Sequence, residues 1–324
     1  MIISVPRDWP PFLSEIVPVL EKWGEIKLNL KIREKLWKIS AATIDRLLAD
    51  TRKRYRIKGR STTKPGTLLK KAIPIRTFAD WDEKVPGFFE VDLVSHDSGA
   101  ARGDFNQSLN FTDISTGWEE MVAVKNKAQV WVFAGIKSIK ERLPFSILGL
   151  DSDNGAEFIN AHLIRYCEEH KITFTRSRPY RKNDSCFVEQ KNWSVIRRAV
   201  SYVRYDTDRE LGILNELYGY LRLYVNFFQP VRKLIKKERI GSKVIKRYDE
   251  AKTPYRRVLA SPDIKDKIKM KLKIQYAMLN PAELKRKITK LQNRLLKLNA
   301  LKQKVIEDLE KSVEPSSRFE YIST

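Results

Sequence analysis

The segment Phe88-Phe-Glu-Val-Asp-Leu-Val94 is an apolar run that carries a carboxylate, Asp92, near its centre. Phe and Val are typical of buried β-strands, and the run has the length of one. A charged group inside such a strand is costly to bury unless a cation or hydrogen bonds compensate it. The segment therefore predicts the first strand of a sheet and marks Asp92 as a candidate functional residue.

The chain that follows this strand predicts four more strands and the helices between them. The predicted strands are residues 88–94, 108–113, 118–124, 145–150 and 173–175, and the predicted helices are residues 128–143, 162–170 and 188–205. Three strands in succession, followed by alternation of helix and strand, indicate an α/β domain. We expect a mixed five-stranded sheet with flanking helices.

Two further acids lie at the ends of predicted elements. Asp153 follows the apolar segment Ile147–Leu150 and precedes the tight-turn pair Asn154-Gly155, so it is presented where a strand ends. Glu189 begins a helix, where a carboxylate is also favoured by the helix dipole. Carboxylate oxygens on two strands and a helix can converge at one edge of a sheet, and such ligands suit Mg²⁺ or Mn²⁺. Two such ions can drive an in-line phosphoryl displacement.

The charge balance favours a polyanionic partner. The 324 residues include 63 Lys and Arg against 40 Asp and Glu, a net charge of +23. Neutralising phosphates with basic side chains releases counterions from nucleic acid, which favours binding. A generically basic protein, such as a ribosomal one, has the same composition, so the charge alone leaves both interpretations open.

Cysteine and histidine are too sparse for other kinds of site. Two cysteines and three histidines allow neither a disulfide framework nor a four-ligand zinc module, and they fit a reduced, intracellular protein. No stretch approaches ~20 consecutive apolar residues, so we expect no membrane span. We expect a cytoplasmic location.

Composition divides the chain into four parts. Residues 1–50 are predicted to form helices, and Ser40 is the expected N-cap of one of them. That helix is either the second helix of a helix-turn-helix or an ordinary amphipathic helix. Residues 51–77 form a basic linker, residues 78–228 the α/β core, and residues 229–324 a basic helical region with a long helix and a disordered tail. Within the last part, residues 231–257 contain eleven Lys or Arg and three acids.

The order and spacing of several motifs resemble a known family. Thirty-five residues separate Asp153 from Glu189. The matching blocks are Ile73-Pro-Ile-Arg76, Pro86-Gly-Phe-Phe-Glu-Val-Asp-Leu-Val94, Thr112-Asp-Ile-Ser-Thr-Gly-Trp118, Asp151-Ser-Asp-Asn-Gly155, Thr175-Arg-Ser-Arg-Pro-Tyr180 and Val188-Glu-Gln-Lys-Asn192. Over about residues 36 to 260, this pattern resembles the Asp, Asp-35-Glu core of retroviral integrases and bacterial insertion-sequence transposases.

The resemblance implies a ribonuclease H-like fold and a transposase or integrase that cleaves DNA ends and transfers the strand through the freed 3′-hydroxyl. It implies Asp92, Asp153 and Glu189 as ligands of two Mg²⁺ or Mn²⁺ ions, with Asp151 as the rival of Asp153. Asp113 and Glu90 are expected to be structural or supporting acids. It further implies a nucleoid-associated bacterial protein that acts as a homo-multimer on element ends and target DNA, with a shortened N-terminal region.

Polar residues around the third acid are candidates for contact with DNA. They are Arg176, Arg178, Arg181, Lys182, Lys191, Asn192 and Arg197. Trp193 also shares the helix face of Glu189, but a core position is expected for it. Two alternatives stay open. One is a catalytically silent or truncated DNA-binding protein derived from a mobile element, and the other is a nuclease of the same fold.

Overall fold

The computed structural model describes residues 8–54, 84–100, 102–153, 155, 157–158, 160–177 and 186–313. Several predictions fall outside these ranges. They concern most of the basic linker, Asn154, the loop residues Arg178, Arg181 and Lys182, and the tail after residue 313.

β1 (Phe88–Ser95) is the central strand of a mixed five-stranded sheet. β2 (Gln107–Asp113) pairs with it antiparallel on one side, and β3 (Glu119–Val124) pairs antiparallel with β2. On the other side, β4 (Gly149–Ser152) runs parallel to β1, and β5 (Thr173–Arg176) runs parallel to β4. The parallel strands need crossover connections, which the intervening helices supply. The predicted α/β fold with a mixed five-stranded sheet is confirmed, in the order β3-β2-β1-β4-β5.

The fourth strand begins later than the sequence predicts. Phe145 and Ile147 are buried, yet they precede β4, and the Phe145 ring stacks on Phe89 at a centroid distance of 5.9 Å. Their alternation therefore reflects burial of a loop and not strand pairing. β4 begins at Gly149, where a side chain has no room, because a Cβ atom there would lie 2.4 Å from the Phe88 ring.

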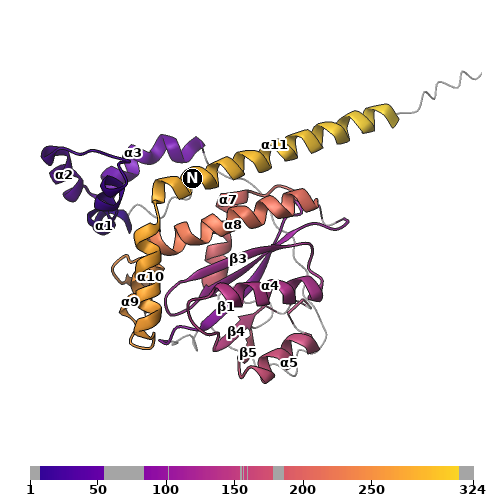
Figure 1. Cartoon of the computed structure of the whole chain (residues 1–324), viewed down its shortest axis with the longest axis horizontal. Coiled ribbons are helices and arrows are strands. Elements are labelled where there is room, and N and C mark those ends of the chain that lie inside the picture. The colour runs from indigo at the N-terminus through magenta and orange to yellow at the C-terminus, as the bar shows by residue number, and fades with distance from the viewer. Residues whose placement is uncertain are drawn as a thin grey trace, which may run out of the picture.

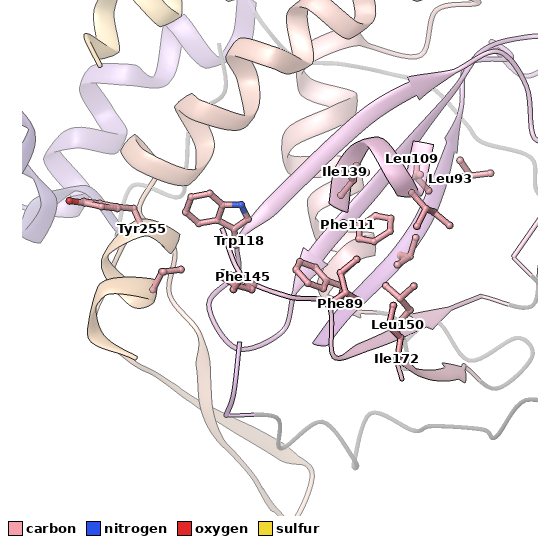
Figure 2. Packing of buried hydrophobic residues seen from close by; sticks show 14 of the residues in the cluster. Phe89, Leu93, Leu109, Phe111, Trp118, Ile139, Phe145, Leu150, Ile172 and Tyr255 are labelled. Atoms are coloured by element: carbon pink, nitrogen blue, oxygen red, sulfur yellow. The ribbon is translucent and has the colours of Figure 1, made fainter. Parts of the chain in front are cut away.

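α4 (Gln129–Arg142) and α5 (Ala161–Glu169) cover one face of the sheet (Figure 1). An apolar cluster fills the space between the sheet and these two helices, and Figure 2 shows part of this cluster. Its members from the sheet, α4 and α5 include Phe89, Leu109, Phe111, Leu150, Ile136, Ile139, Leu163 and Cys167. Burial of these side chains is the main driving force that fixes α4 and α5 on this face.

A second cluster lies on the opposite face. It joins Met121 of β3 to Leu217 of α8 (Asp208–Phe228) and to Ile196 in the segment that leads to α8. α8 starts with a capping box, in which the Thr207 hydroxyl accepts from the Glu210 N–H and the Glu210 carboxylate accepts from the Thr207 N–H. α11 (Pro281–Val313) packs on α8 through its first half, and its second half extends beyond the body of the protein (Figure 1).

Among the residues described before β1, three α-helices are present. They are α1 (Trp9–Lys22), α2 (Leu30–Trp37) and α3 (Ala41–Arg54). The predicted N-cap is confirmed, because the Ser40 hydroxyl accepts from the Thr43 N–H at 3.1 Å. α1 packs on helices from the other end of the chain, with Phe12 in the same cluster as Tyr255 and a 2.8 Å ion pair between Glu15 and Arg256.

The C-terminal region is basic and largely helical, as predicted, but it also contains a hairpin. β6 (Leu234–Ile240) and β7 (Lys243–Tyr248) form an antiparallel pair. α9 (Pro254–Ala260) and α10 (Asp266–Met278) follow before α11. None of the described helices has the length and apolar composition needed to cross a membrane.

Candidate active site

Asp92 lies on β1, and Asp153 directly follows β4, the parallel strand beside it. The register of β1 and β4 pairs Glu90 with Asp151 and Val91 with Ser152, so the next positions in line are Asp92 and Asp153. Adjacent strands lie about 4.8 Å apart, and alternate residues of a strand share a face. Four carboxylates therefore form two rows on one face of the sheet.

Burial and mutual repulsion make the charge of Asp92 unfavourable. Burial raises the pKa of the Asp92 carboxyl well above its ordinary value of 3.8, and the negative charges of Asp153 and Glu189 raise it further. The Leu93 N–H and the Asn192 amide oppose this rise by hydrogen bonding to the carboxylate. All three predicted acids thus lie close enough to interact electrostatically.

Glu189 reaches this face because its helix is bound to β1. It lies on α6 (Cys186–Lys191), one residue after Val188, whose N–H donates to Oε2 of Glu90 at 2.6 Å. Glu90 is fully buried, which raises the pKa of its carboxyl well above 4.5, while the Val188 N–H lowers it. Glu90 therefore holds the start of α6 against the strand that carries Asp92.

Asn192 connects the helix to Asp92 directly. Its Nδ2 donates to Oδ2 of Asp92 at 2.6 Å, and its Oδ1 accepts from Nδ2 of Asn110 at 2.9 Å. The other oxygen of Asp92 accepts from the Leu93 N–H at 2.8 Å. Asn192 begins a π-helical turn that ends at Arg197, a distortion often found at functional sites. The side chain that was expected to contact DNA is half-buried and hydrogen-bonded within the protein.

The donor set suits a hard divalent cation. In the described part of the chain, however, no three Asp, Glu, His or Cys side chains are grouped so that they could hold one metal ion. Both oxygens of Asp92 accept hydrogen bonds from the protein, and Glu189 is exposed. A cation beside Asp92 and Asp153 would offset both the burial and the repulsion that raise the pKa of Asp92, so the residues fit the ion in their chemistry. Joint ligation by all three acids requires their side chains to move.

Lys191 pairs with a buried acid. Its Nζ lies 3.1 Å from Oε2 of Glu119, which is fully buried. Burial raises the pKa of the Glu119 carboxyl, and the charge and hydrogen bond of Lys191 lower it. The sequence did not identify Glu119, because its partner lies far along the chain. Lys191 was expected to contact phosphate, but in this structure it compensates an internal carboxylate.

Arg197 also differs from its expected role at the DNA surface. Its side chain is buried, with Nη2 donating to the Ser95 carbonyl at 2.8 Å and the guanidinium 4.4 Å from the Tyr202 ring centroid. Arg176 is likewise buried, at the end of β5. The reverse holds for Trp193, which was expected in the core but is 53% exposed, with the Arg198 guanidinium 4.4 Å from its ring centroid.

The neighbouring acids have structural partners. Asp113 accepts from the Gly87 N–H at 2.8 Å and from the Thr116 N–H and hydroxyl at 2.7 and 2.6 Å, which agrees with its predicted structural role. Asp151 is buried and accepts from the Thr175 hydroxyl at 2.6 Å. Asp153 is more exposed than Asp151, which supports it as the carboxylate available to a ligand.

Comparison with solved structures finds integrases. At a TM-score of 0.39 and 13% identity, the chain is similar to a chain of the simian T-cell lymphotropic virus intasome in complex with PP2A regulatory subunit B56 gamma, over 66% of this chain and 70% of that one. The chain is similar to the catalytic core domain of BIV integrase at a TM-score of 0.33 and 18% identity, over 52% of this chain and 91% of that one. It is similar to the HTLV-2 integrase catalytic core domain in complex with magnesium at a TM-score of 0.33 and 13% identity, over 45% of this chain and 91% of that one.

Comparison of sequences finds a clearer relative. No family model matches the chain. The chain is 39% identical over 247 residues to the uncharacterized protein y4rM of Sinorhizobium fredii (strain NBRC 101917 / NGR234). That alignment covers 76% of this chain and 71% of the relative. At this identity and coverage, the chain belongs to the family of the uncharacterized protein y4rM.

Proposed function

We propose that the chain is a metal-dependent DNA polynucleotidyl transferase of the transposase and integrase type. The observation that carries the proposal is the placement of Asp92, on β1, beside Asp153, which directly follows the parallel strand β4, with the charge of Glu189 acting on Asp92. Concentrating carboxylates around the half-buried Asp92 opposes folding unless a cation or a proton compensates them. A functional site is the simplest reason to retain such an arrangement.

In this proposal Asp92, Asp153 and Glu189 hold two Mg²⁺ or Mn²⁺ ions. When bound, such ions activate an attacking oxygen and stabilise a leaving one in phosphoryl transfer. The protein's own contribution is to place the ligands. Asn192 orients the Asp92 carboxylate, and Glu90 fixes the helix that presents Glu189. Asn192 and Leu93 each donate a hydrogen bond to one oxygen of Asp92, so a bound cation would use the remaining lone pairs of this carboxylate or replace one of these bonds.

DNA is the proposed substrate, as element ends and as target. The net charge of +23 supports a polyanionic partner. Of the sequence-based phosphate contacts, we retain Arg178, Arg181 and Lys182, which precede α6 in the sequence, and we set aside the buried Arg197. The finer assignments rest on the motif resemblance. They are an insertion-sequence origin, action as a homo-multimer, DNA recognition by residues 1–50 and a linker at residues 51–77.

A catalytically silent DNA-binding protein is the second candidate. It is favoured by the hydrogen bonds that occupy both oxygens of Asp92 and by the lack of a three-ligand group among the described residues. In that case the acids and their partners are a structural remnant that no longer takes a cation. A nuclease that only hydrolyses DNA is a variant of the first candidate.

A cleavage assay with matched variants separates these candidates. The substrate is a supercoiled plasmid that carries the DNA flanking this gene, with Mn²⁺ or with EDTA. We expect the parent and Glu216→Gln, which removes an exposed carboxylate from α8, to cut in Mn²⁺ only. Glu189→Gln is expected to be slower by about 100-fold or more. If every protein binds the DNA and none cuts it, the silent DNA-binding protein is the correct assignment.

A further inference from the structure

The basic stretch between residues 231 and 257 forms a hairpin that the catalytic proposal does not use. The hairpin, residues 234–248, contains six Lys or Arg and one acid, Glu238. Every residue of β7 is exposed. Exposed apolar side chains are present on the same strands, among them Ile235 at 67% and Ile240 at 64%.

The register of the hairpin places like charges opposite each other. Lys236 is the Cα partner of Arg247, and Lys237 is the Cα partner of Lys246. Like charges in directly opposed positions destabilise a β-pair, and a two-stranded hairpin is marginal in water even without them. Lys236 pairs with Glu238. In the described ranges no carboxylate forms an ion pair with Lys243, Lys246 or Arg247, so their charges remain uncompensated.

The root of the hairpin is fixed to the body of the protein. Lys233 donates from Nζ to the Ile114 and Ser115 carbonyls at 2.6 and 2.5 Å, and its N–H donates to Asp249 at 2.6 Å. Arg257 forms an ion pair with the same residue, Asp249. Basic residues at the root are therefore used for anchoring, whereas those nearer the tip are not.

The tip is a tight turn that lets the two strands project together. Gly241 and Ser242 connect them, and Gly241 has φ +59°. Glycine at the first position is typical of a type II′ hairpin turn, which needs a positive φ there. The hairpin is therefore a basic two-stranded ribbon whose root is held by hydrogen bonds to the body of the protein. A ribbon of this kind fits the major groove of B-form DNA, which admits two β-strands.

We propose that the β6–β7 hairpin is an arm that binds duplex DNA, through phosphate contacts of its basic side chains and insertion into the major groove. The proposal rests on the proposed function only in taking DNA as the partner. The root contacts Ile114, whose N–H donates to the Phe88 carbonyl at the start of β1. Asp92 lies four residues further along β1, about 13 Å at the rise of a strand. The role proposed for the arm is to add affinity for DNA without taking part in the chemistry.

The test compares two triple variants with the same loss of charge. Lys243→Gln/Lys246→Gln/Arg247→Gln removes two lysines and an arginine from the hairpin, and Lys290→Gln/Arg294→Gln/Lys297→Gln removes the same set from exposed positions on α11. Binding of a short fluorescent DNA duplex of mixed sequence is measured by anisotropy at several NaCl concentrations, without divalent ions. All six side chains are exposed, so both variants should unfold at the temperature of the parent.

The hairpin variant is expected to bind at least about 10-fold more weakly at low salt, with a slope of log K against log [NaCl] that is smaller by about 2 to 3. The α11 variant is expected to change the slope by less than about 1. Lys243→Gln alone should reduce the slope by about 1. Equal effects of the two triple variants, or no effect of the hairpin variants, would overturn the proposal.

Competitors identify the kind of partner. Duplex RNA has a major groove too deep and narrow for a β-ribbon, so it should displace the DNA less readily than unlabelled duplex DNA does. Equal displacement by duplex RNA, or by vesicles containing phosphatidylserine, would overturn the assignment to DNA. The measurement needs no cleavage. If the arm is required for binding but no protein cuts, only the catalytic proposal fails. If the hairpin variants bind and cut like the parent, only the arm fails.

Discussion

The Nδ2 atom of Asn192 donates a 2.6 Å hydrogen bond to Oδ2 of Asp92, between residues one hundred positions apart in the sequence. Together with the bond from the Val188 N–H to Glu90, it attaches α6 and the turn after it to β1 at two points. The relative positions of Asp92 and Glu189 therefore depend on residues that are not themselves proposed metal ligands.

Asn192→Ala is predicted to weaken this attachment. A hydrogen bond to a charged group contributes about 1.5–3 kcal/mol, so the free energy of unfolding should fall by about that amount. Because Asp92 loses its orientation, we also expect DNA cleavage to slow by about 10- to 100-fold. Urea denaturation and single-turnover cleavage measure the two effects. Gln190→Ala, at an exposed position of the same helix, is the control, and equal behaviour of the two variants contradicts the prediction.

Glu90 offers a second test of helix positioning. Glu90→Ala removes the buried acceptor of the Val188 N–H and should lower the free energy of unfolding by about 1–3 kcal/mol. It should also lower the rate of DNA cleavage. Glu90→Gln keeps a carbonyl oxygen that can accept the same bond, so its cleavage rate should stay within a few-fold of the parent. Equal impairment of the glutamine and alanine variants would show that Glu90 does not act through this hydrogen bond.

Asp153→Asn is predicted to change stability in opposite directions with and without metal. Without divalent ions it removes a charge that raises the pKa of Asp92, so the variant should be more stable than the parent by about 1 kcal/mol. With Ca²⁺ at about 100 times its Kd, the free energy of unfolding of the parent should rise by about 2.7 kcal/mol. The variant should show little of this increase. Urea denaturation in EDTA and in Ca²⁺ gives both values. A parent that Ca²⁺ does not stabilise argues against a cation site.

The acid Asp113 should govern part of the dependence of stability on pH. Burial raises the pKa of its carboxyl from 3.8 to about 6, although hydrogen bonds from Gly87 and Thr116 oppose the rise. The folded state therefore binds the proton more tightly than the unfolded state does. This contribution to stability is fully present below about pH 4 and is lost as the pH rises to about 6, by about 3 kcal/mol in total.

Asp113→Asn should remove that slope. The free energy of unfolding, measured from about pH 4 to about pH 7, should fall less steeply in the variant than in the parent. Other buried acids contribute slopes of the same sign in both proteins, so only the difference between the two curves tests Asp113. Parallel curves would show that Asp113 does not titrate in this range.

Two glycine substitutions test the packing of β4. Gly149→Ala places a Cβ 2.4 Å from the Phe88 ring and should destabilise the protein by about 1–3 kcal/mol. Gly212 lies within α8, where an added Cβ would meet no atom within 4 Å, so Gly212→Ala should stabilise the protein by about 0.5–1 kcal/mol. Thermal unfolding of both variants checks the signs, and a stabilised Gly149→Ala variant contradicts the register of β4 beside β1.

Local patterns predicted five strands from short segments rich in apolar, β-branched and aromatic residues. They misplaced β4, since Phe145 and Ile147 are buried without strand pairing. They also missed the β6–β7 hairpin, which lies in the region predicted to be basic and helical. Alternation identifies burial well, but it does not identify which backbone groups are paired.

The positions of the three acids in strands and helix were predicted, but their partners were not. The ion pair between Lys191 and Glu119 and the bond between Arg197 and Ser95 join distant parts of the chain. A basic residue beside an acidic motif therefore suggested contact with DNA, although both side chains compensate groups inside the protein. Trp193 shows the opposite error, because helical spacing alone does not reveal which face is covered.

The most direct test of the central claim is strand joining. A labelled duplex with the terminal sequence of the DNA flanking this gene is incubated with plasmid, Mg²⁺ and the protein, with either a 3′-hydroxyl or a 3′-deoxy end. We predict covalent joining of the 3′-hydroxyl duplex by the parent, and none with the 3′-deoxy duplex or with Glu189→Gln. Binding or shortening of the duplex by the parent without any joined product would contradict a polynucleotidyl transferase.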